Sequence, residues 1–166
     1  RTLSEMPFFK LLHMNEKLNI RKMRAGEEIT VSRLCKRCIR EINSEDMTKK
    51  QVDYLANYFS VKNIRDSLKD TEIYVTLLAD KIVATGSLCA GRIRAFFVNP
   101  NYHKQGIGAK LVKYLEKKLK QKGYNSVFLR SSKYAVGFYQ KLGFKKRKKI
   151  NSPEVGEVTV MKKKII

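Results

Sequence analysis

The sequence lacks any apolar run long enough to span a bilayer, and we expect no membrane partner. Residues 1–13 do not resemble a secretory signal either, because Lys10 interrupts apolar stretches that are already short. The run that starts at Met14 fits a native start, so we expect residues 1–13 to be an N-terminal extension of native or foreign origin. Residues 14–166 show no internal repeat or linker, and they suit one domain with a sizeable core.

Cysteine is also scarce, and the three cysteines do not make an even set for disulfide bonds. Cys35 and Cys38 match a C-x-x-C pattern, but no second pair and no nearby histidine completes a zinc site or redox dithiol. Their spacing predicts core-facing thiols on one helix. Cys89 has no recognisable histidine partner, so we interpret it as a packing residue and not a nucleophile. We therefore expect no metal site, and a cytoplasmic, reducing location is the simplest setting.

Acidic residues are heavily outnumbered. The 15 Asp and Glu face 36 Lys and Arg, which gives a formal net charge of +21. A nucleic-acid binder would gather this charge on one face and depend steeply on salt. The alternative is a lysine-rich composition spread over solvated faces. The densest runs are residues 117–118, 145–149 and 162–164, but the lysines are otherwise scattered, so we favour the alternative and expect no nucleic-acid partner.

Hydrophobic periodicity predicts strands and helices over the whole domain. Thr48 is a good helix N-cap, and Gln51 follows it at the spacing of a capping box. Turn residues separate three strands in the middle of the chain, which predicts an antiparallel meander. The expected strands are 17–24, 72–78, 82–89, 92–98, one that starts at Val127, 144–150 and 155–161; the expected helices are 29–42, 49–58, 61–68, 106–122 and 133–142.

A glycine-bearing loop, residues 101–110, lies between the expected strand 92–98 and the expected helix 106–122. This arrangement directs backbone N–H groups and a helix N-terminus at one spot, which suits an anionic phosphate. Gly106 and Gly108 carry no Cβ and allow a ligand to approach closely, and Lys104 adds positive charge. By itself the pattern fits an ordinary strand-to-helix turn equally well.

A second motif, residues 132–144, follows the β-rich run 126–130. The two motifs together resemble the Gcn5-related N-acetyltransferase (GNAT) family. Its acyl-CoA motif, Arg/Gln-x-x-Gly-x-Gly/Ala, appears at residues 103–108, and its later motif, Asn-x-x-Ala-x-x-Phe-Tyr-x-Lys-x-Gly-Phe, appears at residues 132–144. His103 replaces Arg or Gln and Ser132 replaces Asn, and both substitutes can hydrogen-bond. The resemblance extends from about Leu18 onward.

The resemblance implies a mixed α/β fold with a central, mostly antiparallel twisted sheet flanked by helices. It implies an N-acetyltransferase that moves the acetyl group of acetyl-CoA directly to an amine acceptor, and the positive field would attract the polyanionic CoA. The alternative is a non-catalytic acyl-CoA sensor or binding module with the same fold. A homodimer is a further expectation, because dimers are common in the family, and the sequence does not identify the acceptor.

Site roles follow from the same resemblance. The loop N–H groups hold the pyrophosphate, and the preceding strand takes up the pantetheine arm like an added strand. The main-chain N–H of Val98 is expected to point at the acetyl oxygen. Phe96 and Phe97 face opposite sides, so at least one belongs to the core. The implied cofactor-binding residues are Phe96, Phe97, Val98, His103, Lys104, Gln105, Gly106, Ile107, Gly108, Ala109 and Ser132.

Tyr139 is the implied catalytic residue. Its phenol, with a reference pKa of about 10, can donate a proton to the departing thiolate. Neighbours on a helix point about 100° apart, so if Phe138 faces the core we expect Tyr139 to face a different surface.

No general base is evident. Some family members carry a Glu near the position of Val127, which cannot serve. Glu41, Glu45 and Asp46 fall in the region that borders the acceptor site in the family. Glu41 is the candidate for binding a cationic acceptor or relaying its proton through water; the alternative is a solvated helix end.

Overall fold

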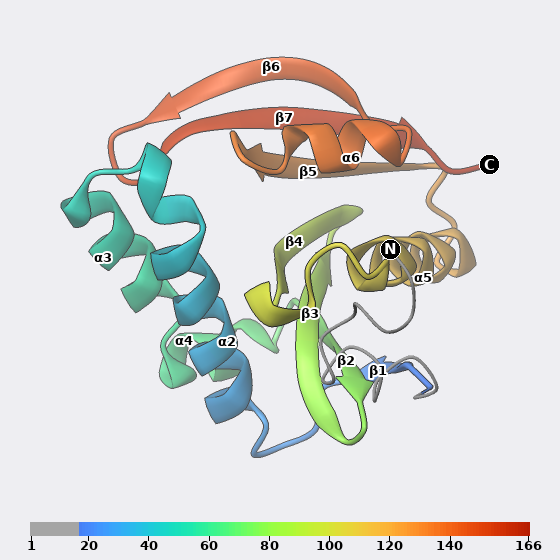
Figure 1. Cartoon of the computed structure of the whole chain (residues 1–166). Coiled ribbons are helices and arrows are strands. Elements are labelled where there is room, and N and C mark those ends of the chain that lie inside the picture. Colours follow the sequence, from blue (N-terminus) through green and yellow to red (C-terminus); the bar gives the residue numbers. More distant parts are fainter. Residues whose placement is uncertain (1–16) are drawn as a thin grey trace, which may run out of the picture.

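A seven-stranded sheet runs through this computed structural model, which describes residues 17–166 (Figure 1). The strand order is β1-β2-β3-β4-β5-β7-β6, and every neighbouring pair is antiparallel except β4 and β5. The expected extension, residues 1–13, lies outside the described residues. The strands are β1 Asn19–Lys22, β2 Glu72–Leu78, β3 Lys81–Cys89, β4 Arg92–Val98, β5 Ser126–Ser132, β6 Lys145–Ser152 and β7 Gly156–Lys164.

Helices cover both faces of the sheet, so the expected mixed α/β architecture is confirmed (Figure 1). The helices are α2 Glu28–Glu41, α3 Lys49–Tyr58, α4 Val61–Ser67, α5 Ile107–Gln121 and α6 Val136–Lys141, with short 3-10 helices η2 Asn43–Asp46 and η3 Pro100–Tyr102. Within residues 17–166, none of these helices has the length and apolar character needed to cross a membrane.

Local sequence signals place most of these elements. The Thr48 hydroxyl accepts from the Gln51 N–H at 3.2 Å, and the Gln51 side chain accepts from the Thr48 N–H at 3.0 Å, so the predicted capping box is present. Helix α6 is shorter than predicted and begins at Val136. The residues before it form a turn in which the Ala135 N–H donates to the Ser132 carbonyl at 3.1 Å.

Two hydrophobic clusters lie on opposite faces of the sheet. One joins α5 and α6 to the sheet, with Leu111 and Leu115 fully buried at its centre. The other joins α2 and α4 to the sheet around Val75. Phe96 packs against the first cluster and Phe97 against the second, which confirms that their side chains face opposite sides.

Gly86 of β3 lies where α5 meets the sheet. A Cβ on this residue would lie 2.9 Å from Leu115 Cδ1 and 3.1 Å from Phe96 Cδ2. Both neighbours are held in a packed interior, which resists displacement. The absence of a side chain at Gly86 therefore lets α5 and Phe96 approach the sheet.

We expect Gly86→Ala to lower the free energy of unfolding by about 1–3 kcal/mol, because the added methyl overpacks this contact. Gly137→Ala is the matched control, since a Cβ there meets nothing within 4 Å and α6 gains a better helix former. Urea unfolding of both variants tests the contact. Equal stability of the two variants would show that α5 can shift without cost.

Candidate functional site

The two central strands, β4 and β5, separate soon after they meet. Their only paired residues are Arg92 and Phe128, and the Phe128 N–H donates to the Gly91 carbonyl at 3.3 Å. Beyond that point the strands diverge (Figure 1). A cavity of about 810 Å³ lies here, lined by β4, β5, the start of α5, α6, and parts of α2, η2, α3 and β7.

Strand β4 carries a bulge at the point where it leaves β5. Its pairing with β3 passes from Thr85–Phe97 to Ser87–Arg94, so β4 contains one extra residue. Ala95 has a φ of +48°, a conformation that is uncommon for a residue with a Cβ. A bulge bends its strand, and bulges are frequent beside active sites.

The backbone of Val98 faces away from β3. The next residue, Asn99, donates its N–H to the Val83 carbonyl at 2.8 Å, and successive residues of a strand point their polar groups to opposite sides. The Val98 carbonyl instead accepts from the Cys38 thiol at 3.3 Å and lies 2.8 Å from His103 Nε2. The Val98 N–H therefore points to the open edge of β4.

His103 belongs to the loop before α5, and its side chain contacts β4 through the Val98 carbonyl. Because a carbonyl oxygen only accepts, Nε2 must carry the proton in the contact with Val98. Only Nδ1 of the ring then remains for a further partner. The contact fixes the distance between the loop and the end of β4.

The loop before α5 has the backbone conformation of a phosphate cradle. Lys104 has a φ of +60° and Gly106 a φ of +78°, and Gly106 is the N-cap of α5. The first helical bond runs from the Lys110 N–H to the Gly106 carbonyl at 3.1 Å. The N–H groups of the first turn, before Lys110, have no acceptor within the helix and carry the positive end of its dipole.

The two loop glycines have different roles. A Cβ on Gly106 would meet nothing within 4 Å, so the positive φ and not crowding requires glycine there. A Cβ on Gly108 would lie 3.0 Å from Phe138 Cζ. Gly108 thus allows the first turn of α5 to pack against α6.

Most of the residues predicted from sequence meet at this one cavity. The exception is Gln105, which does not line it; its side-chain amide lies 3.5 Å from the Asn101 carbonyl. The predicted residues that line the cavity are Phe96, Phe97, Val98, His103, Lys104, Gly106, Ile107, Gly108, Ala109, Ser132 and Tyr139.

Tyr139 lies deeper than expected. It is 5% exposed and packs against Phe96, Phe138 and Phe144, with ring centroids 5.0–6.0 Å away, whereas Phe138 is only half-buried. The expected orientation of the pair is therefore reversed, because Phe138 turns toward Gly108 and Tyr139 turns toward the core beneath the cavity. Burial raises the pKa of the Tyr139 phenol, and no hydrogen bond joins its hydroxyl to residues 17–166.

The carboxylates that line the cavity are Asp46 of η2 and Glu157 of β7. Asp46 lies 3.8 Å from Lys133 Nζ, and Glu157 lies 3.3 Å from Lys149 Nζ. Glu41 does not line the cavity and pairs with Arg37 at 3.0 Å, so it is not placed to serve an acceptor there. The apolar side chains nearest in sequence to Asp46 and Glu157 that line the cavity are those of Ile42, Met47, Val155 and Val158.

Sequence reasoning missed Glu157 and two residues of α2. Cys38 was predicted as a core thiol, and it is buried, but it also lines the cavity and bonds Val98; burial raises its pKa to about 12. Arg37 reaches the Asn99 and Asn101 side chains at 3.2 and 3.1 Å, which ties α2 to the loop. Within residues 17–166 there is no group of three or more His, Cys, Asp or Glu able to hold a metal ion.

Residues 43–165 match the family model described as "Acetyltransferase (GNAT) domain". Among solved structures, a GCN5-related N-acetyltransferase from Rhodopseudomonas palustris superposes with a TM-score of 0.82 at 19% identity, covering 92% of this chain and 99% of that one. The PaiA N-acetyltransferase of Thermoplasma acidophilum in complex with coenzyme A superposes with a TM-score of 0.75 at 20% identity, covering 89% and 99%. An aminoglycoside 6'-N-acetyltransferase complexed with coenzyme A gives 0.66 at 14% identity, covering 89% and 97%. No curated protein sequence matches significantly.

The burial of Tyr139 gives a test that does not depend on activity. Its raised folded-state pKa means that it stays protonated while an ordinary phenol ionises near pH 10. We expect Tyr139→Phe to leave the tyrosinate absorbance of the folded protein at about pH 11 unchanged. Burial and the hydrogen bond to Glu72 also raise the pKa of Tyr74, which leaves seven of the eight tyrosines to give the signal if Tyr139 ionises. Loss of about one seventh of that signal would therefore show that Tyr139 ionises like an exposed phenol. By linkage, the stabilising effect of this shift is complete below about pH 10 and is lost as the pH rises further.

Proposed function

This chain belongs to the GNAT acetyltransferase family, and from that premise we propose that it transfers the acetyl group of acetyl-CoA directly to a primary amine. The observation that carries the proposal is the separation of β4 from β5. It leaves a cavity that extends from the N-terminus of α5, past Tyr139, to the carboxylates Asp46 and Glu157.

The pyrophosphate of CoA binds at the start of α5. The N–H groups of the loop and first helical turn donate to its oxygens, and the positive φ of Gly106 aims them at one point. Lys104 supplies a cation beside them. The pantetheine arm lies along the open edge of β4, where its amides replace the strand partner that β5 does not provide. Two structural relatives are complexed with coenzyme A, which supports coenzyme A as the ligand.

The acetyl carbonyl lies at Val98. As the amine nitrogen attacks the thioester carbon, negative charge develops on the carbonyl oxygen and the Val98 N–H donates to it. A preorganised donor of this kind contributes about 2.7–4 kcal/mol to the transition state. The contacts of Cys38 and His103 with the Val98 carbonyl hold the strand in position for that donation.

Collapse of the tetrahedral intermediate breaks the C–S bond and forms the amide. Tyr139 donates a hydrogen bond to the departing thiolate, which takes its final proton from solvent. Because burial raises the pKa of this phenol, full proton transfer from it is unfavourable, and the phenol acts mainly as a donor. Its contribution therefore falls at the low end of the range for general acids.

The amine enters from the side of Asp46 and Glu157. Alkylammonium groups have a pKa of about 10.4, so the acceptor arrives protonated and is attracted to these carboxylates. The proton it loses passes to water beside them. The strongly positive protein favours the neutral amine that attacks. The apolar lining by Ile42, Met47 and Phe59 accommodates an acceptor with an apolar body. The buried thiols Cys35 and Cys38 suit action in the reducing cytoplasm.

The decisive experiment is a thiol-release assay with acetyl-CoA and a panel of amines that covers aromatic and aliphatic amines, amino acids, polyamines and peptide N-termini. We expect release that depends on the acceptor and is fastest with apolar primary amines. Binding of acetyl-CoA without any acceptor-dependent release would instead identify an acyl-CoA sensor.

Gly106→Val should weaken acetyl-CoA binding at least tenfold by calorimetry, because the loop loses its left-handed residue. Gly26→Val is the matched control: Gly26 also has a positive φ and open space around it, but it lies outside the cavity.

Tyr139→Phe should lower kcat about a hundredfold with the best acceptor and leave acetyl-CoA affinity nearly unchanged. The phenyl ring keeps the packing against Phe96 and Phe144, and only the hydroxyl is removed. Steady-state kinetics and calorimetry on the two proteins separate these effects. An unchanged kcat would leave Tyr139 as a packing residue that gives the departing thiolate no hydrogen bond.

A further inference from the structure

The positive charge is distributed unevenly along the chain. Residues 81–166 contain 21 Lys and Arg against three acidic residues, so this part carries most of the net charge of +21. The sequence interpretation, that the lysines are scattered over solvated faces, is therefore incomplete. The strands of this half bring several of the basic residues together.

Strands β5, β7 and β6 share a face that points away from the core. Leu129 and Met161 are buried on the inner side, so their neighbours along each strand point outward. Two rows of residues cross the outer side of the three strands in the order β5, β7, β6. One row is Phe128, Lys162 and Lys145, and the other is Arg130, Val160 and Lys148. We call this outer surface the basic face, with the residues Phe128, Arg130, Lys145, Lys148, Lys162 and Lys164.

No carboxylate neutralises the basic face. Within residues 17–166, the ion pairs made by these three strands are Lys149–Glu157 and Lys163–Glu116, and both lysines belong to the inner side. Lys145 and Lys162 are direct cross-strand partners, an arrangement of like charges that destabilises a sheet. Lysine on the edge strand β6 protects against edge pairing, but Arg130 and Lys162 lie on internal strands that need no such protection.

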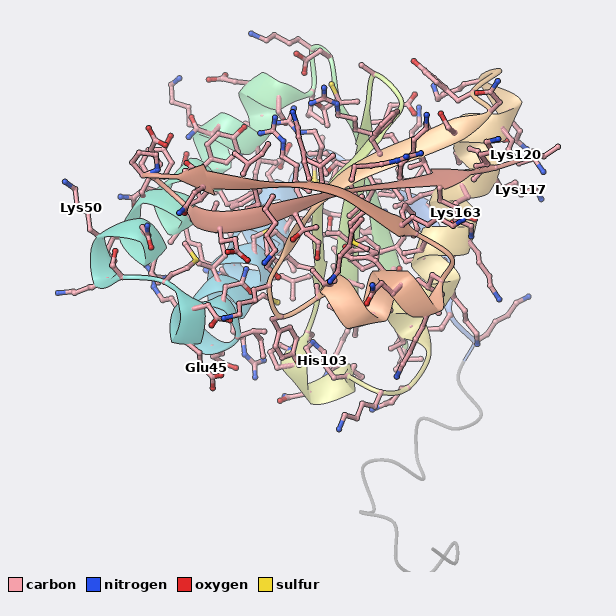
Figure 2. The ribbon with its side chains drawn as sticks, turned by 90° about the horizontal axis from the view of Figure 1, so that it is seen from above. Glu45, Lys50, His103, Lys117, Lys120 and Lys163 are labelled. Carbon is pink, nitrogen blue, oxygen red and sulfur yellow. The ribbon has the colours of Figure 1, made fainter. Side chains whose placement is uncertain are left out.

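The basic face is open. Seen from above, β6 and β7 lie uncovered by the helices of the chain (Figure 2). Lys50 of α3 lies at the opposite end of the molecule from Lys117, Lys120 and Lys163 (Figure 2). The face also carries a partly exposed aromatic ring: Phe128 is 37% exposed, and Lys162 Nζ lies over its ring, 4.8 Å from the centroid. A base that stacks on this ring takes the place of the lysine, which is then free to pair with a phosphate.

We propose that the basic face binds single-stranded nucleic acid. Its cations match a phosphodiester backbone, and the release of counterions favours such contacts. The exposed Phe128 offers a surface on which an unpaired base can stack, which a duplex does not supply. A flat sheet face has no helix or projecting strand to enter a groove of a duplex. This activity goes beyond the proposed acetyl transfer.

The test is fluorescence anisotropy of a labelled single-stranded RNA of about 20 nucleotides at about 0.1 M salt. The face variant is K145Q/K148Q/K162Q, and the matched control is K49Q/K50Q/K81Q, whose exposed lysines make no ion pair within residues 17–166. Both variants change the net charge equally. We expect the face variant to bind RNA at least tenfold more weakly and to lower the salt slope by about 2, while the control stays within threefold.

Equal weakening in the two variants would overturn the proposal, because the attraction would then come from the overall charge. Phe128→Ala should weaken RNA binding at least fivefold and leave duplex binding unchanged. A duplex of the same length, or anionic lipid vesicles, bound as tightly as the RNA and with the same loss in the face variant would also overturn it. Thermal melting reports whether each variant folds. If the triple variant does not fold, K162Q/K164Q gives a second test of the face, because neither lysine lines the cavity of the candidate site.

Discussion

The cavity and the free backbone groups of the candidate site exist because β4 and β5 stop pairing partway along the sheet. Adjacent parallel strands normally share hydrogen bonds along their length, but β4 and β5 share them only at Arg92 and Phe128. The backbone groups beyond that pair face a cavity and are available to a ligand. The bulge at Ala95 and the small residue at Gly86 allow β4 to bend there without losing β3 or α5.

The sequence predicted the features that are encoded locally. The glycine-bearing loop before α5 and the capping box at Thr48 each need particular residues at short spacing. The left-handed turn at Gly106 and the contact of Gly108 with α6 became visible only in the structure. Nonlocal features were harder to predict. The orientation of Phe138 and Tyr139 depends on what α5 and Phe144 present to a helix of six residues, and either ring could have faced the core. Glu157 reaches the cavity only because of its place in the register of the last hairpin.

The clustering of positive charge shows the same limit. Lys145 and Lys162 are far apart in the chain, and only the pairing of β6 with β7 makes them neighbours. That pairing also bears on assembly. The family resemblance leads us to expect a homodimer, but two copies of β6 paired edge to edge would bring their runs of basic residues, 145–149, together. A dimer would therefore use another surface, unless an anion lies between the copies.

The carbonyl of Val98 has a further consequence for the mechanics of the strand. It belongs to the same peptide unit as the Asn99 N–H, which donates to Val83 of β3. Donation to that carbonyl by Cys38 and His103 polarises the peptide and strengthens the bond on its other side. The bond between β4 and β3 is therefore stronger at the point where β4 no longer pairs with β5. The two residues that strengthen it, Cys38 of α2 and His103 of the loop, themselves line the cavity. Cooperative polarisation across a single peptide unit thus lets the sheet remain open on one side of β4 while staying rigid on the other.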